Sequence, residues 1–189
     1  MPVKGEQNRV KILQAAADLF YQRGYNNTSF SDVAMASGVP KGNFYYYFKS
    51  KDELLGAVIG MRKSWLSQLI SEWEAEHTEP KDRLRLIVRL MQDNSVASSR
   101  YGCPVGSLNV ELVKNDEEKR QLSRSLFDLL LSWSEKQFLA MGKGSMAKLL
   151  AIHLMAMAQG GIMISSIYQD EQIILAESER INLWIDALD

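Results

Sequence analysis

Residues 28–53 read TSFSDVAMASGVPKGNFYYYFKSKDE and decide the fold of this chain. Ser29 is followed three residues later by Asp32, a spacing that resembles a capping box at the start of a helix. Gly38 then permits the positive φ of a tight turn, and Pro40 suits the first position of the next helix. The segment is therefore predicted to form two short helices joined by a tight turn, with a third helix beginning near its end.

The same segment carries side chains that bind phosphate. Lys41, Lys49 and Lys51 are basic, and the run Tyr45–Tyr47 adds three phenol hydroxyls. Proteins hold the DNA backbone with such groups while the N-terminus of a helix faces the major groove. We therefore expect this segment to bind double-stranded DNA.

Charge is divided unevenly along the chain. The 189 residues have a formal net charge of -1. Residues 1–51 contain seven Lys or Arg and three acidic residues, a net charge of +4, so the remaining residues together carry -5. A basic head on an acidic body is typical of a protein that touches nucleic acid through one part only.

Cysteine content and hydropathy indicate the compartment. One cysteine excludes an intrachain disulfide, and the opening MPVKGEQNRVK lacks an apolar signal segment, so we expect a cytoplasmic protein. Residues 149–169 contain no Lys, Arg, Asp or Glu and are long enough to cross a bilayer. Polar residues interrupt this stretch and no basic cluster marks a flank. A helix buried in the protein or between subunits is the preferred interpretation.

The pattern predicts an all-α protein of about nine helices. Ile12, Ala16, Leu19 and Phe20 recur at the spacing of one helix face, and Ser50 with Glu53 forms a second capping-box spacing. Cys103 precedes Pro104 and is predicted to cap a helix that begins there. The expected helices cover about 6–22, 30–36, a segment from Pro40, 50–76, 81–97, 104–113, 115–140, 145–168 and 171–188.

Three stretches together resemble the DNA-binding domain of the TetR family of transcriptional regulators. They are AMASGV at 34–39, KGNFYYYF at 41–48 and SKDEL at 50–54. The resemblance covers about residues 6–66 and implies a helix-turn-helix domain there, with its motif at about 29–48. It also implies a helical ligand-binding and dimerisation domain over 67–189.

The resemblance assigns roles within the motif. Tyr45 and Lys51 are expected to hold phosphates, with Ser29 as a further backbone contact. The groove is expected to face Lys41, Gly42, Asn43 and Tyr46, with Asn43 reading a base because its amide both donates and accepts. Phe44, Phe48 and Tyr47 are expected to pack inside the domain.

Cys103 is the one candidate for chemical reactivity. A thiol at a helix N-terminus is activated by unpaired N–H groups, and Gly-Cys at this place resembles a subgroup of the family that includes the repressor of N-ethylmaleimide reductase. The alternative is a small filler at a helix junction. An enzyme that uses Cys103 with His153 is a further alternative, although no third orienting group is evident.

Two further groups of residues are candidates for a ligand pocket and for a dimer interface. The resemblance implies a ligand pocket among the middle helices. Met and Trp side chains are candidates to line it, with ordinary core packing as the alternative: Trp65, Met91, Trp133, Met155, Met157 and Met163. The small residues around Gly160 allow close helix approach, and the resemblance implies that the last two helices form a four-helix dimer interface. The interface is therefore assigned to Gln159, Gly160, Gly161 and Ile162.

The function predicted from these features is a homodimeric transcriptional regulator, a repressor released from a palindromic operator by a small-molecule effector or by modification of Cys103. A helical partner-binding protein that has lost DNA binding is a rival. Neither a cofactor nor a metal site is expected, since Cys and His lack ligand spacing.

Overall fold

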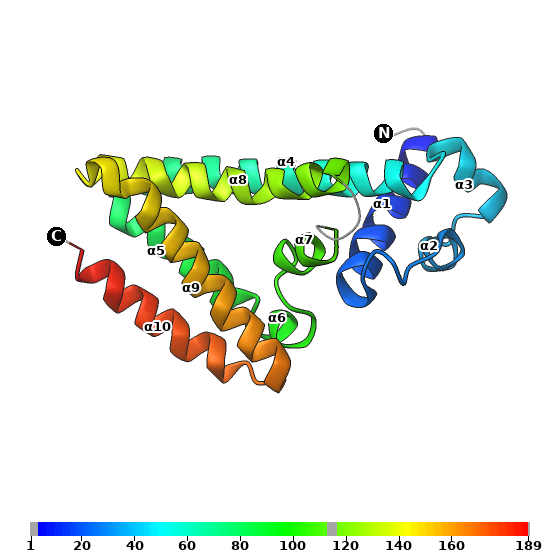
Figure 1. The fold of residues 1–189 in the computed structure, drawn as a ribbon. Helices are drawn as coiled ribbons and strands as arrows, with labels where there is room; N and C mark the ends of the chain where they lie inside the picture. Colours follow the sequence, from blue (N-terminus) through cyan, green and yellow to red (C-terminus); the bar gives the residue numbers. More distant parts are fainter. Residues whose placement is uncertain (1–3, 113–116, 189) are drawn as a thin grey trace. The chain divides into compact units, whose positions relative to one another are not determined.

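The computed structural model describes residues 4–112 and 117–188, and these residues form an all-α fold (Figure 1). The all-α class and its N-terminal helix-turn-helix are as predicted. The described residues contain ten α-helices and one 3₁₀ helix. They are α1 (Lys4–Arg23), α2 (Phe30–Ser37), α3 (Lys41–Tyr47), α4 (Lys51–Glu76), α5 (Pro80–Asp93), α6 (Ser95–Tyr101), α7 (Gly106–Leu112), α8 (Glu117–Ala140), η1 (Gly144–Met146), α9 (Ala147–Tyr168) and α10 (Gln172–Asp186).

The chain forms two compact units. The head unit comprises the residues up to Trp65 together with Ser107–Arg124, and the body unit comprises Leu66–Gly106 and Ser125–Asp189. The chain therefore passes between units within α4, at the start of α7 and within α8. The domain limits 6–66 and 67–189 remain a prediction, and the structure groups Ser107–Arg124 with the head.

The head is built on the predicted apolar stripe of α1. Ile12, Ala16, Leu19 and Phe20 are all buried, and α2 packs on α1. Burying such side chains stabilises the fold by about 1.5–3 kcal/mol for each large one. This packing holds the short helices α2 and α3, which are too short to be stable alone.

The ends of α2 follow the sequence prediction. Ser29 is the N-cap, and Ser29 and Asp32 form a complete capping box. Gly38 ends the helix at φ 66°, in the left-handed region, and Val39 is buried beneath the turn. The predicted roles of these residues are confirmed. Pro40 lies one position earlier than expected, as the N-cap of α3.

The start of α4 differs in one detail from a capping box. The N–H of Glu53 donates to Ser50 Oγ at 3.0 Å, as the spacing predicts. The carboxylate of Glu53 accepts from the N–H of Lys49 at 2.7 Å, one residue before Ser50. The turn from α3 into α4 is therefore closed by hydrogen bonds at both ends.

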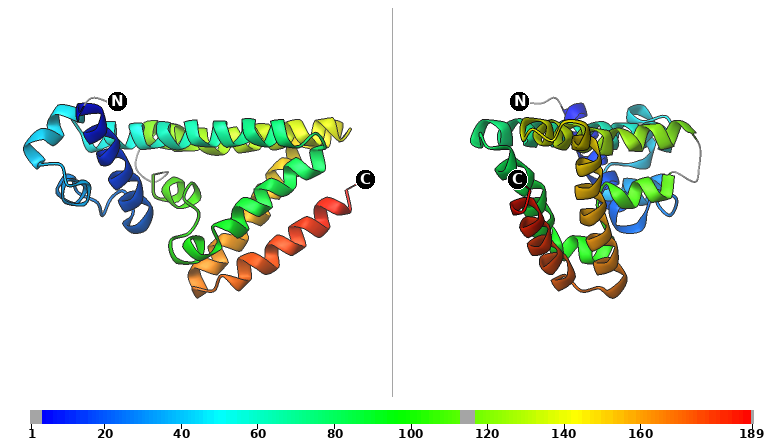
Figure 2. Two further views of the ribbon diagram at one scale, coloured as in Figure 1. Left: turned by 180° about the vertical axis from the view of Figure 1, so that it is seen from behind. Right: turned by 60° about the vertical axis from the view of Figure 1, so that its left-hand side comes forward.

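The body unit is organised around α10, which packs on α5 and on α9 (Figure 2). The single helix expected over 81–97 is two helices, because the backbone at Asn94 leaves helical geometry (φ -104°, ψ 10°) between α5 and α6. Met91, Trp133, Met155 and Ile162 are buried in the core of this unit.

Two expectations near α7 and α8 are affected by the structure. Pro104 and Val105 form a turn, and α7 begins at Gly106, so Cys103 is not the helix cap that the sequence predicts. The proline closes a turn before the helix instead of occupying its first position. The cap expected at Asn115 lies outside the described residues.

The uncharged stretch forms α9. Gly144–Tyr168 is long and apolar enough to cross a membrane by length and composition, a test that core helices of soluble proteins also pass. Eight residues of α9, including Leu154, Met155 and Ile162, are buried inside the unit. The buried residues recur along one face, which is typical of a helix packed on one side.

Candidate nucleic-acid interface

Helix α3 presents polar side chains outward from an aromatic anchor. Phe44 and Phe48 are fully buried, while Lys41, Gly42 and Asn43 are exposed. Tyr46 is 81% exposed and Tyr45 is 51% exposed. The predicted groove-facing residues therefore share one exposed surface of a helix that is fixed from behind.

Lys41 and Ser31 link the two helices of the motif. Lys41 Nζ donates to Ser31 Oγ at 2.8 Å, and both residues are exposed. The contact places an ammonium group where α2 and α3 adjoin. Ser31 was not singled out from the sequence, although its place in the first turn of α2 indicated an exposed hydroxyl.

Ser29 forms hydrogen bonds within the first turn of α2, which it caps. Its N–H and its hydroxyl both donate to Asp32 Oδ2, at 2.7 and 2.5 Å. These hydrogen bonds hold the pKa of the Asp32 carboxyl below its usual value. Ser29 remains exposed, and its role as a phosphate contact stays a prediction.

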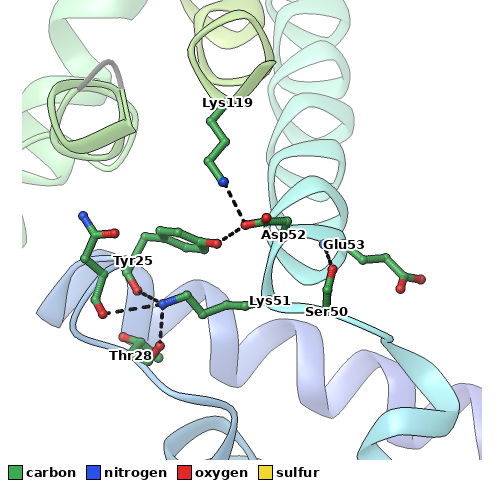
Figure 3. A network of polar contacts seen from close by, with 8 residues as sticks. Tyr25, Thr28, Ser50, Lys51, Asp52, Glu53 and Lys119 are labelled. Atoms are coloured by element: carbon green, nitrogen blue, oxygen red, sulfur yellow. Dashed lines mark hydrogen bonds and ion pairs between the residues drawn. The ribbon is translucent and has the colours of Figure 1, made fainter. Parts of the chain in front are cut away.

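Lys51 is bound by the turn between α1 and α2 (Figure 3). Its Nζ donates to the carbonyl oxygens of Tyr25 at 2.8 Å, Thr28 at 3.0 Å and Asn26 at 3.5 Å. The ammonium also lies 4.2 Å from the centre of the Tyr25 ring. Its three donors are thus taken by backbone oxygens, so the predicted phosphate contact requires one of these bonds to exchange.

Burial and the nearby carboxylates shift the pKa of Lys51 in opposite directions. Desolvation is the larger effect and lowers the pKa of its ammonium, while the carboxylates of Glu111 and Asp52 raise it. Asp52 accepts from the hydroxyl of Tyr25 and pairs with Lys119 Nζ at 3.2 Å (Figure 3). This network joins the α1–α2 turn, α4 and α8 within the head unit.

Glu111 binds backbone N–H groups of the same turn. Its Oε2 accepts from the N–H of Tyr25 at 2.8 Å, and its Oε1 accepts from the N–H of Asn26 at 2.6 Å. Sequence reasoning missed this contact, because residues 86 positions apart leave no local pattern.

Cys103 lies in the body unit beside α9. It is half-buried, and Gln159 Nε2 donates to its sulfur at 3.4 Å. His153 contacts the ring of Trp184, with ring centres 5.1 Å apart. Cys103 and His153 thus contact different residues, Gln159 and Trp184, so the structure gives the enzyme alternative no support.

The six residues predicted to line a ligand pocket do not gather in one place. Met91, Trp133 and Met155 are buried in the body core, and Met157 packs against it. Trp65 belongs to the head unit and is 55% exposed, and Met163 is 56% exposed. Helical spacing identifies apolar residues but not the direction in which each one points.

The predicted interface residues are mostly used inside the body unit. Gly161 and Ile162 are buried, and a Cβ on Gly161 would lie 3.0 Å from Glu177 of α10. Gln159 contacts Cys103, and Gly160 is half-exposed. A neighbouring face of α9 instead exposes large apolar side chains: Leu149, Ile152, Met163, Ile164, Ile167 and Tyr168.

Two family models match the chain. Residues 12–58 match bacterial regulatory proteins of the tetR family, and residues 80–179 match the C-terminal domain of LmrA/YxaF-like transcriptional regulators. An uncharacterised HTH-type transcriptional regulator of Lactococcus lactis is 33% identical over 87% of this chain and 86% of its own length. The HTH-type transcriptional regulator LmrA of Bacillus subtilis is 30% identical over 84% of this chain and 86% of its own length.

Solved structures agree on the fold. A TetR-family regulator from Agrobacterium tumefaciens superposes with a TM-score of 0.85 at 20% identity, covering 96% of this chain and 98% of that one. Reduced NemR of E. coli has a TM-score of 0.78 at 18% identity over 92% of this chain and 95% of its own. That likeness concerns the fold alone, so the predicted Gly-Cys subgroup is not confirmed. The chain is a DNA-binding transcriptional regulator that belongs to the TetR family, with a C-terminal domain of the LmrA/YxaF-like type.

Proposed function

We propose that this protein is a cytoplasmic repressor that binds a palindromic operator as a homodimer and is released by a small-molecule effector. The exposed surface of α3 carries the proposal. Lys41, Asn43 and Tyr46 are all exposed there, while Phe44 fixes the helix from behind. An amide and a phenol in that position suit base edges, and the ammonium suits phosphate.

The exposed apolar face of α9 supports the homodimer. Ile152, Ile167 and Tyr168 are 45%, 65% and 71% exposed on one long helix. A soluble protein rarely leaves several such side chains together in water, and a two-fold partner would cover them. Two copies of α3 related by that symmetry would require a palindromic site.

Unsatisfied polar atoms in the body unit support an effector. Ser134 Oγ, Ser178 Oγ and Asn182 Oδ1 are buried and have no hydrogen-bond partner among the described residues. Leaving such an atom unpaired costs about 1–3 kcal/mol, so a polar group that reached one of them would be stabilised there. The alternative route is modification of Cys103, whose half-buried sulfur has one amide donor at 3.4 Å.

The test begins with selection of genomic DNA fragments on the purified protein. The recovered duplex is then titrated at several salt concentrations with wild-type protein, Lys41→Ala and Lys51→Met. Each lost phosphate contact lowers the slope of log affinity against log salt by about 0.9. Lys136→Ala is the matched control, because Lys136 is exposed on α8 in the body unit.

The outcomes separate the roles of the two lysines. We expect Lys41→Ala to weaken binding and reduce the slope. If Lys51 only holds the α1–α2 turn, Lys51→Met lowers affinity at an unchanged slope; if it also binds phosphate, the slope falls. Failure to enrich any duplex, or wild-type behaviour of Lys41→Ala, would contradict the assigned surface.

A further inference from the structure

The turn between α1 and α2 is held by two opposite charges, one on its N–H groups and one on its carbonyl oxygens. Glu111 accepts the N–H groups of Tyr25 and Asn26, and Lys51 donates to the carbonyl oxygens of Tyr25, Asn26 and Thr28. Hydrogen bonds to a charged group are about twice as strong as those between neutral groups. The peptide groups of this turn are therefore fixed on both their donor and acceptor sides.

The backbone before the turn is shaped for the carboxylate. Gly24 has φ +86°, which favours glycine, and a Cβ at this position would lie 2.9 Å from Glu111 Oε2. Thr28, at the end of the turn, is buried and donates its hydroxyl to the carbonyl of Gly24 at 2.8 Å. Gly24 thus provides the approach that the carboxylate uses.

The turn sets the position of the DNA-binding helices. It ends at Ser29, the N-cap of α2, and α2 in turn contacts α3. A displacement of the turn therefore displaces the first helix of the motif. Glu111 itself lies on α7, whose residues from Ser107 onward belong to the head unit.

We propose that Glu111 is a positioning residue for DNA binding, which holds the α1–α2 turn through the N–H groups of Tyr25 and Asn26 and so fixes the presentation of α2 and α3. The proposal rests on the DNA-binding function. It makes α7 a working part of the DNA-binding head, although α7 lies outside the sequence motif.

Glu111→Gln tests the proposal with a clear sign. The amide keeps the shape but replaces one acceptor by an NH₂ group, which faces a backbone N–H. Removing a negative charge from the head would by itself strengthen attraction to DNA. We instead expect binding of the selected duplex to weaken by up to about tenfold, the limit set by one hydrogen bond to a charged group, because part of the binding energy must then hold the turn in place. The salt slope should not change, because Glu111 contacts no phosphate in this account.

Glu118→Gln is the matched control. Glu118 is an exposed carboxylate of α8 in the same unit, and it makes no ion pair or hydrogen bond among the described residues. Its loss changes the charge equally without touching the turn, so affinity should be unchanged or slightly higher. Glu111→Asp keeps the charge on a shorter stem and should recover part of the affinity. Binding is measured well below the melting temperature of each variant, so that lost stability does not mimic lost positioning.

Amide hydrogen exchange provides a readout that needs neither DNA nor a variant. In the wild-type protein the backbone N–H groups of Tyr25 and Asn26 should exchange slowly. The backbone N–H of Asn27 donates no hydrogen bond within the described residues and should exchange fast, although the side chain of Asn27 donates to the carbonyl of Arg23. Equal rates at the three positions would overturn the proposal, as would equal duplex affinity of Glu111→Gln and Glu118→Gln. If Glu111→Gln does not fold, the wild-type exchange comparison decides. If no duplex is enriched, the proposed function fails, while the exchange comparison still tests whether Glu111 holds the turn.

Discussion

Gly24→Ala is the substitution whose effect follows most directly from the structure. The new Cβ meets two separate obstacles: a backbone at φ +86° and the Glu111 carboxylate, whose Oε2 would lie 2.9 Å away. Gly38 offers a matched comparison within the same unit. Its φ is +66°, and nothing lies within 4 Å of the position that a Cβ would occupy.

The two obstacles contribute separable free energies. An L-residue in the left-handed region costs about 1–2 kcal/mol, which is the whole expected effect of Gly38→Ala. At Gly24 the carboxylate must also withdraw, which weakens a hydrogen bond to a charged group worth about 1.5–3 kcal/mol. We therefore expect Gly24→Ala to lower the free energy of unfolding by about 2.5–5 kcal/mol.

Urea unfolding measures the free energy of unfolding of both variants. The protein concentration is held fixed, because the stability of the proposed homodimer depends on it. Adding Glu111→Ala closes a double-mutant cycle. In that background no carboxylate opposes the new Cβ, so Gly24→Ala should cost only the backbone term. Equal costs for Gly24→Ala and Gly38→Ala, together with no change in the Glu111→Ala background, would show that the Glu111 carboxylate adds nothing to the cost.

Three further predictions concern the sensor, the dimer and pH. N-ethylmaleimide should release DNA from the wild-type protein but not from Cys103→Ser if Cys103 is the sensor; equal release in a band-shift assay would remove it from the mechanism. Ile167→Glu should convert a sedimenting dimer into a monomer, because it places a charge on the exposed apolar face of α9; an unchanged dimer would exclude that face. The pKa of Asp32 is lowered by its hydrogen bonds from Ser29, so its contribution to α2 is present above about pH 4, the unfolded value, and is lost as pH falls through the lower folded value. Helix content by circular dichroism should then fall more below about pH 4 in the wild type than in Asp32→Asn, and identical curves would contradict the assignment.

Features that depend on neighbouring residues could be predicted from the sequence. The α1 stripe, the capping box at Ser29 and the positive φ of Gly38 each arise from side chains within a few positions. The burial of Phe44 and Phe48 was expected because an aromatic run on a short helix usually packs into the core. These local features are sufficient to place the helix-turn-helix and its exposed surface.

Features that depend on the direction in which a side chain points could not be predicted from the sequence. Gly161 is small and Ile162 is apolar, which suits an interface, but Gly161 faces α10 and Ile162 is buried in the core of its own unit. Composition does not distinguish a close approach within a subunit from one between subunits. The break at Asn94 and the turn at Pro104 likewise depend on how flanking helices pack.

Lys51 illustrates how one residue supports two interpretations. Its place in the segment SKDEL resembles a phosphate-binding position, yet its ammonium binds three carbonyl oxygens of the α1–α2 turn. Glu53 in the same segment binds the N–H of Lys49. Both charged side chains therefore close backbone turns, and the fold alone accounts for their presence. The proposed DNA contact consequently lies on α3, where Lys41, Asn43 and Tyr46 are exposed. Because Glu111 and Lys51 hold opposite sides of one turn, weakening either should displace the same helices, and the salt slope then distinguishes a residue that touches phosphate from one that only positions it.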